Sequence, residues 1–142
     1  MRMLYAFLLT NLSLDWIHRF TNAIILVCSV DKTDSLLKDG VDKFIPFIIE
    51  TMKIQSIKFI PFILVVNKID LPLEKHVISD KIIEEQVKKY GIPAWTKISC
   101  LQDIGGPDVY SNLIDQMVKK LYWEHLLRNV EKTRKKKKCQ MM

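Results

Sequence analysis

The chain has 142 residues, about the length of one domain, and its 49% hydrophobic and 27% charged residues are typical of a globular protein with a core. No apolar run reaches the roughly 18 residues that a membrane span requires. The apolar stretch 3–14 also lacks the small-residue cleavage site of a secretory signal. Three scattered cysteines without C-x-x-C spacing favour a reducing compartment over a disulfide framework or a zinc site.

The net charge of +6 is concentrated at the carboxyl end. Residues 132–138 hold six of the 22 basic side chains, which leaves 16 basic against 15 acidic residues over positions 1–130. Proteins that bind nucleic-acid grooves usually spread positive charge over a folded face. This distribution instead favours a tail that binds anionic membrane lipid, with nucleic acid as the weaker alternative. We therefore divide the chain into a folded part, residues 1–130, and a basic tail, residues 131–142.

Three short apolar runs rich in β-branched residues predict strands that are buried on both faces. They are residues 22–30, residues 59–66 and the weaker run 94–99. Each run is followed by a helical pattern, so the order βαβαβα predicts an α/β fold with three parallel strands and flanking helices. Ligands of such sheets bind at the carboxyl ends of the strands.

The helix after the first strand is expected to be capped by Asp34 or Ser35. We expect it to kink or divide at Pro46, because proline removes a backbone donor and collides with the preceding turn. The hexapeptide KFIPFI occurs at 43–48, within this helix, and again at 58–63, where it leads into the second strand. We assign the two copies to different structures and infer no repeat architecture.

The last two helices have clear signals at their ends. In the helix between the second and third strands, Ser79 predicts the N-cap and Gly91 predicts the end. The final helix is expected to open at GGPDVY, where Pro107 suits the first turn and Asp108 suits the positive end of the helix dipole. Its apolar stripe fades before the lysines.

Polar side chains end the second predicted strand, at the edge where a parallel sheet binds ligands. The sequence at 67–70 reads NKID, so Asn67, Lys68 and Asp70 follow directly after a Val/Ile/Leu run. This segment resembles the N-K-x-D guanine-specificity motif of small GTPases of the Ras type. The stretch 23–36 is also similar to the strand and helix start that precede this motif in the family.

By this resemblance, Asp70 would accept hydrogen bonds from the ring N–H and the exocyclic amine of guanine. Adenine has an acceptor in place of the ring donor, and a buried polar group without a partner gives such sites a selectivity of up to about 10⁴–10⁵. The Asn67 side chain would bond the base and brace the adjoining loop. The Lys68 stem would lie along the ring and the sugar.

A second segment, KISCLQD at 97–103, resembles the S-A-K loop of the same family. The resemblance implies that Ser99 orients the Asp70 carboxylate. It also implies that the backbone N–H of Cys100 reaches the guanine carbonyl oxygen. Leu101 stands where the family has a lysine, so an aliphatic side chain would pack on that face of the base.

The family's phosphate and magnesium motifs are absent from this sequence. It contains no G-x-x-x-x-G-K-[ST], and its D-x-x-G at 103–106 falls after the base-binding loops. The resemblance covers roughly residues 13–142, with 13–20 in the place of the second switch helix. We therefore expect a partial P-loop GTPase fold that lacks the phosphate-loop strand. The strand at 23–30 would be an exposed edge, for which residues 3–9 could supply a substitute partner.

The chain ends in CQMM, which fits a C-a-a-X pattern and predicts farnesylation of Cys139. Gln140 departs from the aliphatic residue that is usual at that position, and the alternative is a solvated basic end with an accidental cysteine. A single prenyl chain holds a membrane reversibly, and basic residues add about 1 kcal/mol each near anionic lipid. We expect attachment to the cytoplasmic face of a membrane, in particular the plasma membrane.

Together these features predict a Ras-like small GTPase, a guanine-nucleotide-dependent and membrane-tethered signalling switch that works with effector or regulator proteins. Because the sequence has no recognisable phosphate-loop or Mg²⁺ ligands, we expect weak or absent binding of GTP or GDP and no hydrolysis by this chain alone. The alternatives are a pseudo-GTPase binding module, a gene-model fragment with no independent function, and a nucleic-acid binder that acts through its tail.

Overall fold

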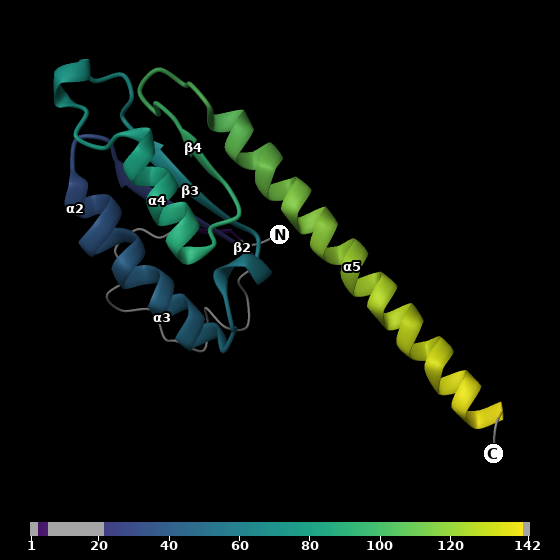
Figure 1. Ribbon diagram of the computed structural model, residues 1–142. Coiled ribbons are helices and arrows are strands. Elements are labelled where there is room, and N and C mark those ends of the chain that lie inside the picture. Colours follow the sequence, from purple (N-terminus) through teal and green to yellow (C-terminus); the bar gives the residue numbers. More distant parts are fainter. Residues whose placement is uncertain (1–2, 6–21, 141–142) are drawn as a thin grey trace.

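The computed structural model describes the backbone of residues 3–5 and 22–140 (Figure 1). In this part of the chain, parallel strands form one open sheet in the order β1-β2-β3-β4. The strands are β1 Met3–Tyr5, β2 Ala23–Ser29, β3 Phe62–Asn67 and β4 Trp95–Lys97. The predicted α/β class and the three predicted parallel strands, now β2, β3 and β4, are confirmed.

Helices cover both faces of this sheet (Figure 1). α2, α3 and α4 lie on one face, as expected when right-handed crossovers connect β2 to β3 and β3 to β4. α5, which follows β4, lies on the other face. The helical segments are α2 Thr33–Leu36, the π-helical turn η1 Leu37–Val41, α3 Asp42–Met52, the 3₁₀ turns η2 Ile57–Phe59 and η3 Leu73–Lys75, α4 Asp80–Tyr90 and α5 Gly106–Gln140.

Alternating strand residues supply two hydrophobic cores, one on each face of the sheet. The larger core packs β2 and β3 against α2, α3 and α4, and the smaller core packs the same strands against α5. Both faces of β2 and β3 are therefore apolar, which explains their continuous hydrophobic runs in the sequence. Buried members of the smaller core include Ile25, Ile63, Val65, Val109 and Leu113.

The amino-terminal residues supply a partner for the edge of β2. β1 pairs in parallel with β2, with Met3 opposite Ala23 and Tyr5 opposite Ile25. The expected substitute strand is therefore confirmed for residues 3–5. The rest of that prediction, and the segment assigned to the second switch helix, lie outside the described residues.

The second copy of KFIPFI is only partly a strand. Ile57–Phe59 forms a turn of 3₁₀ helix, and β3 begins at Phe62, three residues later than predicted. Pro61 immediately precedes the strand, because a residue without an N–H cannot donate to the ladder of a central strand. The first copy lies in α3, so the two copies take different structures, as expected.

The break in the first helical segment was predicted at Pro46 and lies instead at Gly40. Gly40 has φ −99° and ψ −109°, which is not helical, and η1 joins α2 to α3 there. A Cβ at Gly40 would collide with the carbonyl oxygen of Ser35, so this close approach requires glycine. Pro46 is accommodated in the second turn of α3, where its missing N–H removes one helical hydrogen bond.

The predicted cap of α2 was also wrong. The N-cap is Lys32, whose backbone is extended and whose side chain makes no capping hydrogen bond. Ser35 lies inside α2, where its Oγ accepts the N–H of Ser29 at 2.9 Å and donates to the Lys32 carbonyl at 2.6 Å. The Ser35 hydroxyl therefore ties the end of β2 to the start of α2.

The predicted ends of α4 and the start of α5 are confirmed. The Ser79 hydroxyl accepts the N–H of Ile82 at 3.4 Å, and α4 ends at Gly91 with φ 65°. α5 opens at Gly106 and continues to Gln140, across the boundary placed between the folded part and the tail. Within the described residues, no helix combines the length and the apolar character that a bilayer span would need.

Replacing Gly40 with alanine should destabilise the protein by about 1–3 kcal/mol, because the added methyl group must displace the Ser35 carbonyl. Gly106→Ala is the matched control, since a Cβ there meets nothing within 4 Å, and its effect should stay within about 0.5 kcal/mol. Urea denaturation followed by circular dichroism measures both changes. Equal effects of the two substitutions would contradict this account of the helix break.

Candidate functional site

The parallel register brings the loops after β2, β3 and β4 together at the carboxyl ends of the strands. Ser29, the last residue of β2, pairs with Asn67, the last residue of β3. Lys97, the last residue of β4, pairs with Val66. The polar residues that follow these three strands are therefore neighbours, although up to 70 positions separate them in the sequence.

The expected contact between Ser99 and Asp70 is present. The Ser99 hydroxyl donates to Asp70 Oδ1 at 2.5 Å and accepts the backbone N–H of Gln102 at 3.1 Å. Ser99 is only 1% exposed, so its hydroxyl is fixed between these two groups. Among the described residues, Ser99 alone hydrogen-bonds the Asp70 carboxylate, and Oδ2 is left to accept from another molecule.

The Asn67 side chain joins the two loops. Its Oδ1 accepts the backbone N–H of Lys68 at 2.7 Å and that of Cys100 at 3.1 Å. The brace expected for Asn67 is thus visible, but the Cys100 N–H that was assigned to a guanine carbonyl donates to Asn67 in this structure. A bound carbonyl oxygen would have to share this donor with Asn67 or take it over.

Backbone hydrogen bonds hold the NKID segment as a fixed turn. The Ile69 N–H donates to the Ile98 carbonyl at 3.2 Å, and the Leu71 N–H donates to the Lys68 carbonyl at 3.1 Å. Lys68 itself has φ 71°, a left-handed conformation that is uncommon for residues other than glycine. The segment is therefore shaped by its neighbours across the sheet edge.

Asp31 joins the site, although the sequence did not indicate it. Lys68 Nζ lies 3.5 Å from Asp31 Oδ2, and the Ser29 hydroxyl donates to Asp31 Oδ1. The Ser29 hydrogen bond foremost, with further help from the charge of Lys68, holds the pKa of Asp31 below its usual value. The one available signal was position: Asp31 comes two residues after the end of β2, beside the end of β3.

The 99–104 loop places its remaining residues in solvent. Ser99 and Ile104 exchange two backbone hydrogen bonds, at 3.1 and 2.9 Å, which close the loop at its base. Cys100 is exposed and Leu101 is 84% exposed. The Leu101 side chain therefore makes little contact with the described chain and faces solvent.

The other cysteine in the described body has a different environment. Cys28 lies in β2 and is 3% exposed. Burial raises the pKa of its thiol to about 12, against a smaller lowering from a backbone hydrogen bond. Cys28 is therefore a neutral core residue at physiological pH and not a nucleophile.

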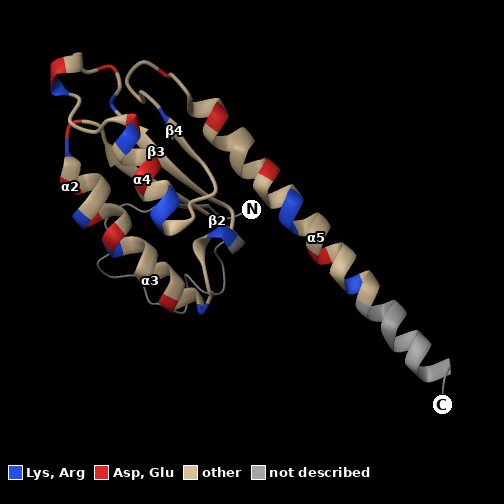
Figure 2. Cartoon of the chain, in the orientation of Figure 1, with Lys and Arg blue, Asp and Glu red and all other residues tan. Residues whose placement is uncertain are grey.

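No metal site is evident in the part of the chain that the structure describes, where no cluster of three or more His, Cys, Asp or Glu has the geometry to hold an ion. Basic and acidic positions alternate along the ribbon of the body (Figure 2). Cys139, the predicted lipidation site, belongs by its backbone to the end of α5.

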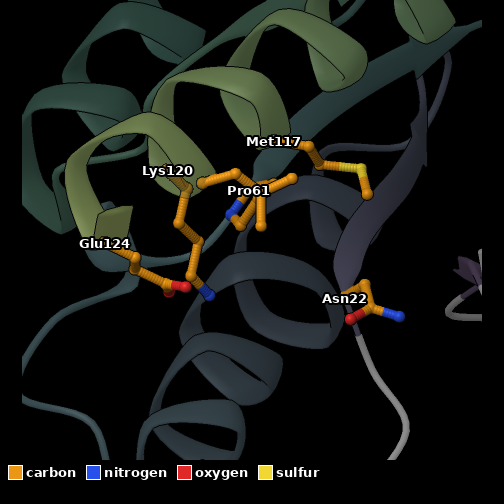
Figure 3. Close-up of a pocket in the computed structure, with 6 residues that line it drawn as sticks. Asn22, Pro61, Met117, Lys120 and Glu124 are labelled. Carbon is orange, nitrogen blue, oxygen red and sulfur yellow. The ribbon is translucent and has the colours of Figure 1, made fainter. Parts of the chain in front are cut away.

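A separate cavity of about 360 Å³ lies at the amino ends of β2 and β3, beneath α5 (Figure 3). Asn22 and Pro61 stand just before β2 and β3, so this cavity is a full strand length away from Asp70. None of the residues predicted for base binding contributes to it. Its lining consists of Asn22, Pro61, Met117, Lys120, Leu121 and Glu124.

Comparison with protein-family models finds no match to this chain, and a search of the curated proteins finds no similar sequence.

Removing the Ser99 hydroxyl tests the central contact of the site. Ser99→Ala deprives Asp70 of its donor and the Gln102 N–H of its acceptor, which should lower the free energy of unfolding by about 1–3 kcal/mol. Ser111→Ala, at an exposed position of α5, is the control and should change stability by less than about 0.5 kcal/mol. If both variants unfold at the same urea concentration as the wild type, Ser99 does not hold the loop.

Proposed function

We propose that this chain is a Ras-like guanine-nucleotide-binding protein that recognises the guanine base at Asp70 and attaches to a membrane through its carboxyl end. The proposal includes the partial P-loop GTPase fold expected from the sequence. In that arrangement β1 occupies the position beside β2 that the family gives to its phosphate-loop strand. Effector or regulator proteins would read the nucleotide state.

The hydrogen bond between Ser99 and Asp70 is the observation that carries the proposal. It joins the two segments that resemble separate motifs of the family, 29 positions apart in the sequence. A carboxylate held in this way presents acceptors to a ring N–H and an adjacent amine, which guanine has and adenine does not. An adenine in the same place would leave the carboxylate facing a ring lone pair, and a polar group without a partner is strongly unfavourable in a binding site.

The surrounding groups fit this role. Asn67 braces the 99–101 loop against the NKID turn, so that the Cys100 N–H and the Asp70 carboxylate keep a fixed separation. Lys68 forms an ion pair with Asp31 at 3.5 Å, and its aliphatic stem would lie along the bound base and sugar. These residues recognise a base and sugar, and no residue is assigned to phosphoryl transfer.

Asp70→Asn should exchange guanine for xanthine as the preferred base. Xanthine carries a carbonyl oxygen where guanine has its exocyclic amine, and an asparagine amide can donate to that oxygen while its own carbonyl accepts the ring N–H. Amide chemical shifts of the labelled protein provide the measurement, because they detect weak binding. GDP should perturb residues of the two loops in the wild type, and xanthosine diphosphate should do so in the variant.

Two controls make this experiment decisive. Asp108→Asn, a change of the same kind at an exposed position of α5, should keep the preference for guanine. ADP at the same concentration should leave the loop amides of the wild type unperturbed. Equal shifts with ADP and GDP, or none with either nucleotide, would remove base recognition and leave an interaction module that acts without nucleotide.

The proposed membrane attachment depends on Cys139. Cys139→Ser should reduce the share of the protein in the membrane fraction of eukaryotic cells several-fold, since a basic segment without a lipid chain binds weakly. Cys100→Ser, which removes the exposed thiol of the site loop, serves as the control and should leave the membrane share unchanged. An unchanged distribution of the Cys139 variant would exclude lipidation at this residue.

A further inference from the structure

α5 extends well beyond the sheet that it covers. It has 35 residues, so at about 1.5 Å per residue it is about 52 Å long. Its buried residues, Val109 and Leu113, lie in its first turns, and Met117 is the last side chain that packs on the core. Figure 1 shows the rest of the helix leading away from the body.

The projecting part of α5 carries a large apolar surface. Trp123 is 63% exposed, Leu127 61% and Val130 51%. With Tyr122 and Leu126 they occupy positions i, i+1, i+4, i+5 and i+8, which share one side of a helix. We call these five residues the projecting face. Exposed apolar patches of this kind mark sites of interaction.

The other side of the same turns is polar. It holds Glu124, His125, Arg128 and Asn129, with an ion pair between Glu124 and Arg128 at 3.5 Å. At 3.6 residues per turn, the projecting face lies roughly a quarter turn from the residues that contact the sheet. The sheet therefore does not cover it. The first half of α5 has its apolar side on the sheet, and the second half has its apolar side roughly a quarter turn away, in solvent.

Two observations favour anionic membrane lipid as the partner of the projecting face. Tyr122 and Trp123 stack edge to face, with ring centroids 6.2 Å apart, and these two residue types are enriched where a membrane meets water. The face is followed directly by residues 132–138, of which six are Lys or Arg. A parallel pairing with a second copy would bring two such segments together, whereas anionic lipid neutralises them.

We infer that the projecting face of α5, which includes Trp123 and Leu127, inserts into the headgroup region of an anionic membrane. The inference rests on the proposed membrane attachment and adds to it a contact that needs no lipid on Cys139. A helix with an apolar face and an adjacent basic segment binds at the interface without spanning it. The prenyl chain and the helix would then act as two linked anchors, each of which binds reversibly when it acts alone.

The test uses the full chain made in bacteria, which carries no lipid on Cys139. Its affinity for phosphatidylcholine–phosphatidylserine vesicles is measured by co-sedimentation. Trp123→Ser/Leu127→Ser should weaken binding by about tenfold or more, because two large apolar side chains no longer leave water. Ile114→Ser/Val118→Ser, at exposed positions of the same helix beside the sheet, should bind as the wild type does. Vesicles of phosphatidylcholine alone should bind the wild type at least tenfold more weakly.

Equal binding by the wild type and the Trp123/Leu127 variant would overturn the inference. So would a dimer of the wild type in analytical ultracentrifugation that the same variant converts to a monomer, because the face would then cover a second copy. Amide shifts with GDP are recorded on the same samples. Vesicle binding without any GDP effect would remove the proposed base recognition and leave this inference standing.

Discussion

The parallel pairing of β2 with β3 and of β3 with β4 is the constraint on which the candidate site depends. It places Ser29 opposite Asn67, so that the loops after all three strands open at one edge. A slip of one residue would turn the Asn67 side chain to the other face of the sheet and separate it from the Cys100 N–H. Since both faces of β2 and β3 are buried, the apolar cores hold this register, and the energy of packing determines the geometry of polar groups at the rim.

The polar groups at the rim are linked in one chain of contacts. Ser29 holds Asp31, Asp31 attracts Lys68, and Asn67 bonds the backbone of both its neighbour and the next loop. The Ser99 hydroxyl completes the series at Asp70. Loop residues without such links would lose more conformational freedom on binding a ligand. Contacts between the ends of three strands therefore hold the polar groups in place before a ligand binds.

Local patterns were sufficient for the presence of three strands, although β3 starts later than predicted, and for the caps of α4, since each is encoded by a few adjacent residues. The contact of Asp70 with Ser99 was expected only from the resemblance of two segments to motifs of one family. The helix break was assigned to Pro46, the one local signal for a break, and lies at Gly40. The close approach of the Ser35 carbonyl to Gly40 depends on how α2 and α3 pack, which no local pattern shows. Asp31 was missed for a related reason: its partner Lys68 is 37 positions away and adjacent only through the register. Exposure along α5 also depends on where the sheet ends.

The side chain of Gln116, in the third turn of α5, behaves as a peptide group toward β3. Its Oε1 accepts the N–H of Phe62 at 2.9 Å, and its Nε2 donates to the carbonyl of the same residue at 3.0 Å. This two-point bond fixes the axial position of α5 against the strand, because sliding the helix by one residue would break both contacts. The projecting part of α5 is therefore tied through Gln116 to the first residue of β3, the strand whose last residue begins the NKID turn.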